Sequence, residues 1–350
     1  MFAHAPAPVP TLHQTDLFRP HADPDDHWDL ACVYALAVEG RLDLKGILID
    51  YPPPALPESA PDIEAVAQLS RLTGVVAPVA VGSSRPMRAA ADRQDDAPAS
   101  EQGGAAFVVR TLREATAPVV IHIVGSCRDI ALAANREPAL FRDKCAAIYL
   151  NAGTGWPDPD AVPEHEYNVQ LNAAAYSAIF DVDCPIYWMP CFETVIGERV
   201  VREYATWYDF RQDEILPHLS PGLQRYFASM LSRATDTSWL QALTAADTRA
   251  IFAARGPEFR NMWCTGGFLH SVGLSVTLDG EIVPLAEVGD RAAFTFEPIS
   301  VTCDDSGRTR WRADPEARKR FIFRVANRTA YRGAMTTALK TLVMTLTDSL

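Results

Sequence analysis

The chain lacks the features of proteins that bind nucleic acids or span membranes. It has 32 Lys and Arg against 44 Asp and Glu, a formal net charge of -12, and no dense run of basic residues. Such a surface repels phosphate backbones, so nucleic acid is not an expected partner. No stretch approaches the roughly 18 consecutive apolar residues of a spanning helix, and residues 1–10 resemble no signal peptide. We therefore expect a cytoplasmic protein without a membrane partner.

Motifs of several common catalytic classes are also missing. There is no Gly-x-Ser-x-Gly nucleophile turn, no phosphate loop ending in Gly-Lys-Ser or Gly-Lys-Thr, and no Gly-x-Gly-x-x-Gly after a strand. The seven cysteines are scattered, odd in number and set mostly in apolar segments such as Ala31-Cys32-Val33. This pattern is typical of reduced thiols in a core, and not of a disulfide framework or a zinc site.

The residues that are present indicate a large α/β protein. Of the 350 residues, 48% are hydrophobic and 22% charged, which allows a sizeable core. Strand-type and helix-type apolar runs alternate through residues 10–195, which predicts a mostly parallel central sheet flanked by helices. Strands are expected at 11–15, 44–49, 77–81, 118–124, 146–150 and 185–189, and helices at 26–38, 61–73, 104–116, 127–135 and 170–181. We expect one Rossmann-like domain over 1–350, with a helical section and a small β-hairpin within 196–350.

Acidic residues are concentrated at the first turn from strand to helix. Asp16 follows the first expected strand, and Asp23-Pro24-Asp25-Asp26 leads into the first helix. Ligands bind beyond the carboxyl ends of parallel strands, so these acids are candidates for a functional site. Their mutual repulsion would be relieved by calcium or magnesium, which prefer oxygen ligands. The alternative is that the acids only cap the helix and favour its positive end.

Three stretches, in order along the chain, resemble inosine-uridine preferring nucleoside hydrolases. The first is Thr15-Asp16-Leu17 followed by Asp23 to Asp26, with three more residues between the first acid and the pair than the family has. The second is the turn from Ile123 to Ala131, and the third is Glu166-Tyr167-Asn168-Val169 followed by Ala173-Ala174-Ala175. The resemblance covers roughly residues 10 to 195 and is loose beyond them.

This resemblance implies a calcium site and a general base. Asp16 and Asp26 would ligate Ca²⁺ together with the main-chain carbonyl of Arg128, and Asp23 is a further candidate ligand. Asp16 would also take a proton from a calcium-bound water. Such a base contributes on the order of 10² to 10⁴ in rate.

The same resemblance implies a riboside as substrate. Asp25 and Asn168 would bind ribose hydroxyls, while Glu166 would reach the outer end of the sugar. Cleavage of an N-glycosidic bond develops positive charge on the sugar, which carboxylates stabilise. The alternative for Glu166 and Asn168 is an ordinary polar loop before a helix.

The sequence departs from the family pattern late in the chain. In the family, a His-Asp pair near the start of a late helix supplies a leaving-group acid and the last calcium carboxylate. The best local match here is His270-Ser271, which gives His270 as the acid and Ser271 as a weaker ligand. The alternative for His270 is a hydrogen-bonded residue of the core, because a single His beside apolar residues often has that place. Asp50 to Pro54 replace the family's Gly-Asn, so the aglycone could differ from the common purines and pyrimidines.

Two alternatives to nucleoside hydrolysis therefore stay open. One is a sugar-binding or nucleoside-binding protein on the same scaffold that has lost turnover, because fold does not determine function. The other is hydrolysis of a non-nucleoside substrate. Family analogy further suggests a homodimer or homotetramer.

Overall fold

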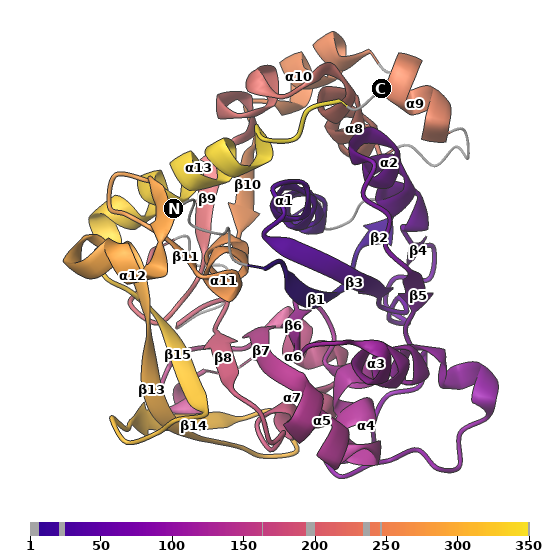
Figure 1. Cartoon of the computed structure of the whole chain (residues 1–350), viewed down its shortest axis with the longest axis vertical. Coiled ribbons are helices and arrows are strands. Elements are labelled where there is room, and N and C mark those ends of the chain that lie inside the picture. The colour runs from indigo at the N-terminus through magenta and orange to yellow at the C-terminus, as the bar shows by residue number, and fades with distance from the viewer. Residues whose placement is uncertain are drawn as a thin grey trace.

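The computed structural model describes residues 7–20, 25–162, 164–193, 200–233, 239–245 and 247–348. Its centre is a nine-stranded sheet in the order β14-β13-β15-β8-β7-β6-β1-β3-β5 (Figure 1). The strands β1, β3, β5, β6, β7, β8 and β15 pair in parallel, whereas β13 pairs antiparallel with both β15 and β14. The predicted α/β fold with a mostly parallel sheet is confirmed.

The strands of this sheet match the predicted strands in the first half of the chain. Along the chain they are β1 (Val9–Thr15), β3 (Leu42–Ile49), β5 (Val79–Val81), β6 (Val119–Ile123), β7 (Cys145–Asn151), β8 (Ile186–Met189), β13 (Phe294–Cys303), β14 (Thr309–Ala313) and β15 (Arg320–Val325). Three two-stranded sheets complete the β-structure: β2 (Phe18–Arg19) with β4 (Ala60–Pro61), β9 (Tyr208–Arg211) with β10 (Phe259–Met262), and β11 (Leu274–Val276) with β12 (Ile282–Pro284).

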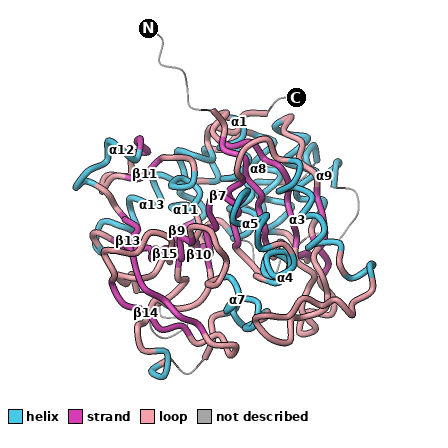
Figure 2. The backbone as a smooth tube through the Cα atoms, turned by 60° about the horizontal axis from the view of Figure 1, so that its bottom comes forward, coloured by secondary structure: helices cyan, strands magenta, loops and turns pink. Residues whose placement is uncertain are grey.

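Helices cover both faces of the sheet, as Figure 1 shows. On one face, a hydrophobic cluster joins α1 (Asp25–Val38), α2 (Ile63–Thr73), α8 (Pro221–Leu231), α11 (Thr265–Ser271) and α13 (Arg328–Val343). On the other, which is turned toward the viewer in Figure 2, a second cluster joins α3 (Gly103–Glu114), α4 (Arg128–Arg136), α5 (Pro138–Lys144) and α7 (Ala173–Ile179). Four short helices complete the structure: α6 (Tyr167–Leu171), which contacts α7, α9 (Trp239–Ala245) and α10 (Thr248–Arg255), which contact α8, and α12 (Leu285–Val288), which contacts β11 and β12.

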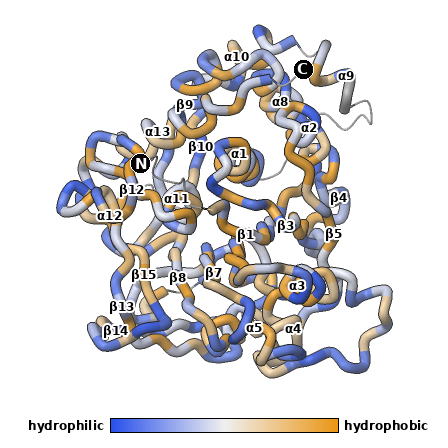
Figure 3. Tube along the Cα trace, viewed as in Figure 1, coloured by the Kyte–Doolittle hydropathy of each residue, from blue (hydrophilic) through white to orange (hydrophobic). Residues whose placement is uncertain are grey.

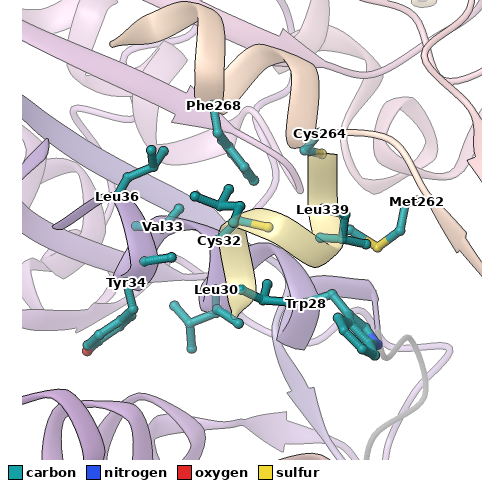
Figure 4. Close-up of a cluster of buried hydrophobic side chains, with 14 of the residues drawn as sticks. Trp28, Leu30, Cys32, Val33, Tyr34, Leu36, Met262, Cys264, Phe268 and Leu339 are labelled. Carbon is teal, nitrogen blue, oxygen red and sulfur yellow. The ribbon is translucent and has the colours of Figure 1, made fainter. Parts of the chain in front are cut away.

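Helix α1 is the most enclosed helix of the first cluster. All residues from Asp26 to Leu36 are buried, so the helix has no solvent face along this stretch. Hydrophobic residues run along α1 (Figure 3), and Figure 4 shows side chains of α1 beside Phe268 and Leu339. This packing holds the first turn of α1, with its two acids, in a fixed position at the end of β1.

Candidate active site

The structure brings the predicted acids together around one cavity. The cavity measures about 210 Å³ and lies where β1, β6 and β7 end and where α1 and α6 begin. Five predicted residues line it: Asp16, Asp25, Asp26, Glu166 and Asn168. Six others that line it were not singled out from the sequence: Val124, Asn151, Tyr167, Cys191, Phe192 and Trp263.

Asp16 and Asp26 are held beside each other by the ends of two elements. Asp16 directly follows β1, and Asp26 lies in the first turn of α1, where the positive end of the helix favours a carboxylate. Thr15, the neighbour of Asp16 in the chain, links the two elements, since its hydroxyl donates a hydrogen bond to Oδ1 of Asp26. Both acids are only 3% exposed, so their charges face the cavity and not bulk water.

A glycine in the turn after β6 allows this close packing. A Cβ at Gly125 would lie 2.7 Å from the main-chain nitrogen of Asp16 and 2.6 Å from Oδ2 of Asp50. Asp50 is fixed there, because it accepts hydrogen bonds from Gln14 Nε2 at 2.7 Å and from Ser126 N at 2.6 Å. Burial, and then the nearby charge of Asp16, raise the pKa of Asp50 well above its usual range. A second carboxyl group, that of Asp50 directly after β3, therefore lies beside Asp16.

Gly125→Ala should disturb the position of Asp16, because the added methyl group meets main-chain atoms that cannot move independently. We expect a loss of about 1 to 3 kcal/mol in the free energy of unfolding, the usual cost of overpacking. We also expect loss of any activity that depends on Asp16. Urea denaturation measures the first effect, with Gly103→Ala as the control because no atom lies within 4 Å of a Cβ there. Equal stability of the two variants would contradict this account.

Glu166 and Asn168 connect α6 to the ends of β6 and β7. Glu166 caps α6 by accepting from Asn168 N at 2.9 Å, and its other oxygen accepts from Gly153 N at 2.8 Å. The amide of Asn168 donates to the carbonyls of Val124 and Asn151, at 3.2 and 3.0 Å. Burial raises the pKa of Glu166 from 4.5 to about 7.

This raised pKa makes stability depend on pH in a defined direction. Between about pH 4.5 and 7, the folded chain retains on Glu166 a proton that the unfolded chain releases. The free energy of unfolding therefore falls as pH rises through this window, by on the order of 3 kcal/mol from this group. Glu166→Gln should remove this part of the slope in urea denaturation measured from pH 4.5 to 7.5. Identical slopes for the two proteins would contradict the assignment.

His270 and Ser271 are not brought to the cavity. They lie in the last turn of α11, where Nδ1 of His270 contacts the hydroxyl of Tyr149 at 2.7 Å. Ser271 donates to the carbonyl of Phe268 at 2.7 Å. Burial lowers the pKa of His270 to about 4, so its imidazole is neutral at pH 7 and a poor proton donor. Ser271 is buried and His270 is half-buried, away from the residues that line the cavity.

The two residues before α11 are Trp263 and Cys264, of which Trp263 reaches the cavity. Trp263 lines the cavity, and Sγ of Cys264 donates to Oδ1 of Asn151 at 3.2 Å. The thiol of Cys191 reaches the same oxygen at 3.5 Å. Burial, and then the charge of Asp29, raise the pKa of Cys264, so this thiol is neutral at pH 7. The resemblance led us to expect the imidazole of His270 and the hydroxyl of Ser271 at the cavity, and the structure has the indole of Trp263 there, with the thiol of Cys264 on Asn151 behind it.

The structure does not bring Arg128, another predicted ligand, to the cavity. Arg128 opens α4, and its guanidinium donates to the carbonyl of Ser83 and, at 3.2 Å, to that of Leu171. Among the described residues, the residue of this turn that lines the cavity is Val124, four positions earlier. Asp23 lies outside the described residues.

The donor atoms of the cavity suit a hard cation, but they are few. Carboxylates of Asp16 and Asp26 and the carbonyl oxygen of Val124 are oxygen donors of the kind that Ca²⁺ prefers. No group of three His, Cys, Asp or Glu side chains within the described ranges is arranged to hold a metal ion. Because two carboxylates and one carbonyl are few ligands for Ca²⁺, the residues fit a cation held with low affinity.

Comparisons with known proteins agree with this fold. The model of the family described as inosine-uridine preferring nucleoside hydrolase matches residues 22–336. Among solved structures, the effector protein XOO4466 has a TM-score of 0.52 and 13% identity, over 97% of this chain and 95% of that one. The plant nucleoside hydrolase PpNRh1 has a TM-score of 0.50 and 12% identity, over 96% and 99%.

A further solved structure, the inosine-uridine preferring nucleoside hydrolase of Bacillus anthracis, has a TM-score of 0.49 and 12% identity, over 95% of this chain and 99% of that one. No curated protein sequence gives a significant match. Within the described residues, no helix is both long and apolar enough to cross a bilayer. The match of the family model over most of the chain shows that this protein belongs to the inosine-uridine preferring nucleoside hydrolase family.

Proposed function

We propose that this chain hydrolyses the N-glycosidic bond of a nucleoside or a related riboside. The observation that supports this proposal is the convergence of Asp16, Asp25 and Asp26 with Glu166 and Asn168 on one cavity, although they come from segments about 150 residues apart. An acidic cavity favours the positive charge that develops on the sugar as the bond to the base breaks.

Each acid has a separate role in this proposal. Asp16 is the general base, because it is buried at the cavity wall and can accept the proton of a water that attacks the anomeric carbon. Asp25 and Asn168 bind ribose hydroxyls, and Glu166 binds the outer end of the sugar. Hydrogen bonds with main-chain groups hold the side chains of Glu166 and Asn168 in place before the substrate binds.

Calcium is the proposed cofactor, held by Asp16, Asp26 and the carbonyl of Val124. When bound, a divalent cation makes a coordinated water easier to deprotonate. Val124 replaces Arg128 in this proposal because Val124 lines the cavity. A homodimer or homotetramer in the cytoplasm stays a prediction.

A second candidate function is binding of a riboside without turnover. The observation that favours it is the pair Trp263 and Cys264, which supplies neither a carboxylate nor an acid that ionises near pH 7. Both candidates predict that a ribosyl group occupies the cavity, and they differ in whether the glycosidic bond is broken.

Hydrolysis of 4-nitrophenyl riboside separates the two candidates, since nitrophenolate leaves without a proton. We expect turnover by the purified protein, a decrease of at least about tenfold after treatment with a chelator, and recovery when calcium is added back. Binding of the riboside without release of nitrophenol would favour the second candidate. Neither binding nor turnover would contradict both.

A further inference from the structure

The stretch that follows Asp16 is tied to a neighbouring strand and helix. Between Asp16 and Asp25 the chain is three residues longer than in the family, and its described part includes β2, which pairs antiparallel with β4. Asp62 follows β4 directly and precedes α2, and its main-chain N–H donates to the carbonyl of Leu17 at 2.9 Å. Because Leu17 is the residue after Asp16, this bond holds the chain beside the first acid.

The side chain of Asp62 holds the first turn of α1. Its Oδ2 accepts from Nε2 of His27 at 3.2 Å, and the side chains of His27 and Asp62 are only 1% and 3% exposed. His27 is the residue after Asp26 in this turn. The carbonyl of His27 also accepts from the hydroxyl of Tyr226 at 3.4 Å. Asp62 therefore contacts the chain neighbour of Asp16 and that of Asp26.

Asp62 also caps a helix, a structural role that needs only one of its oxygens. Oδ1 accepts from Ala65 N at 3.0 Å and closes the start of α2. A single side-chain oxygen is enough for such a cap, and Ser supplies it about as well as Asp. The contact of Oδ2 with His27 is therefore a separate feature, which capping does not explain.

A salt bridge joins β2 to α2 nearer the surface. Nη1 of Arg19 in β2 lies 2.6 Å from Oε1 of Glu64 in the first turn of α2. These side chains are 14% and 31% exposed, so water competes with this pair more than with His27 and Asp62. The buried contact between His27 and Asp62 is thus the one expected to matter most for the position of the acids.

We propose, on the basis of the proposed function, that Asp62 is a positioning residue that sets the spacing of Asp16 and Asp26 around the cation. Its main chain acts on Asp16 through Leu17, and its side chain acts on Asp26 through His27. Asp62 itself is not one of the described residues that line the cavity. Removal of a group that holds metal ligands in place typically lowers metal affinity or activity by about 10- to 100-fold.

Asp62→Ser tests this assignment, because Ser keeps the cap of α2 but has no second oxygen for His27. Terbium is a luminescent substitute for calcium, and Trp263 in the cavity wall is placed to sensitise its emission. We expect the affinity of Asp62→Ser for terbium, and its kcat for 4-nitrophenyl riboside, to fall by about 10- to 100-fold. Luminescence titration and steady-state kinetics measure the two quantities.

Three further variants separate positioning from a loss of stability. His27→Leu removes the same contact from the other side and should lower terbium affinity and kcat similarly. Asp62→Asn should recover most of the affinity, because its amide nitrogen can donate to the imidazole while its oxygen caps α2. Asp247→Ser is the control, since Asp247 caps α10 by accepting from Arg249 N and Ala250 N at 3.1 and 3.4 Å. It should leave both quantities unchanged, and urea denaturation verifies that every variant is folded.

The outcomes distinguish this inference from the proposed function. Folded Asp62→Ser and His27→Leu proteins with wild-type terbium affinity would overturn the inference and leave the hydrolase proposal intact. A loss of affinity that Asp62→Asn shows in full would also overturn it, since the charge of Asp62 and not its contacts would then be responsible. Terbium binding that depends on Asp62 in a protein without turnover would support the inference and contradict hydrolysis. A wild-type protein with neither terbium binding nor turnover would overturn both.

Discussion

Asp16→Asn is expected to lower kcat for riboside hydrolysis by about 10² to 10⁴, the range that a positioned general base contributes. Asn has nearly the same shape as Asp but cannot accept the proton of the attacking water. The side chain is buried at the cavity wall, where solvent cannot readily replace it as a base. Because ribose hydroxyls are assigned to Asp25 and Asn168, KM should change much less than kcat. Steady-state kinetics with 4-nitrophenyl riboside measures both constants.

Asp43→Asn is the matched control for this prediction. Asp43 lies near the start of β3, where it pairs with Lys45 at 2.6 Å and 44% of its side chain is exposed. The same loss of charge at this surface position should leave kcat unchanged, since surface ion pairs contribute little. An Asp16→Asn protein with wild-type kcat would show that another group activates the water.

Trp28→Ala is expected to lower the free energy of unfolding by about 3 to 5 kcal/mol, the usual cost of removing a buried Trp. Trp28 is fully buried and stacks on Phe227, with ring centroids 4.0 Å apart. Phe210 meets its ring edge to face at 5.0 Å. Removal leaves a cavity within the packing that holds the first turn of α1 in place, so activity should fall as well. Urea denaturation measures the change in stability.

Phe259→Ala provides the comparison for Trp28→Ala, since it also removes an aromatic ring. Phe259 is 44% exposed, and its main contact is the guanidinium of Arg332, 5.3 Å from the ring centroid. Its replacement should cost below about 1 kcal/mol. Similar costs for the two variants would indicate that α1 is not held by the core contacts described above.

The position of the acids in the first turn could be predicted because it depends only on the neighbouring strand and helix. A strand followed by a helix puts Asp16, Asp25 and Asp26 at the carboxyl end of the sheet, whatever the rest of the chain does. The same reasoning applies to Glu166 and Asn168, which lie where α6 begins. These five residues share one cavity in the structure.

The late helix could not be placed from the sequence, because its match rested on a single His. The stretch around His270 is apolar and glycine-rich, so its boundaries have no strong local signal. The structure begins α11 at Thr265, and His270 then lies about 8 Å along the helix axis from that end. The dipeptide Trp263-Cys264 contains no group that suggests catalysis, so sequence reasoning passed over it.

The order of strands and several wall residues depend on long-range contacts that no local pattern specifies. Strand β15 comes from the last tenth of the chain and pairs in parallel with β8, which extends the sheet beyond the predicted half. Asn151 directly follows the strand expected at 146–150 and was not predicted as a site residue. In the structure its amide nitrogen donates a hydrogen bond to Met189 O at 2.8 Å. Its side-chain oxygen accepts from the thiols of Cys191 and Cys264. Asn151 therefore takes part in the wall through residues 38 to 113 positions away.

A crystal structure with bound ribose is the most direct test of the central claim that these acids surround a sugar-sized cavity. We predict density for the sugar between Asp16 and Asn168, with hydroxyl groups within hydrogen-bond distance of Asp25 and Asn168. Sugar bound elsewhere on the protein, with the cavity filled only by water at saturating ribose, would contradict the account.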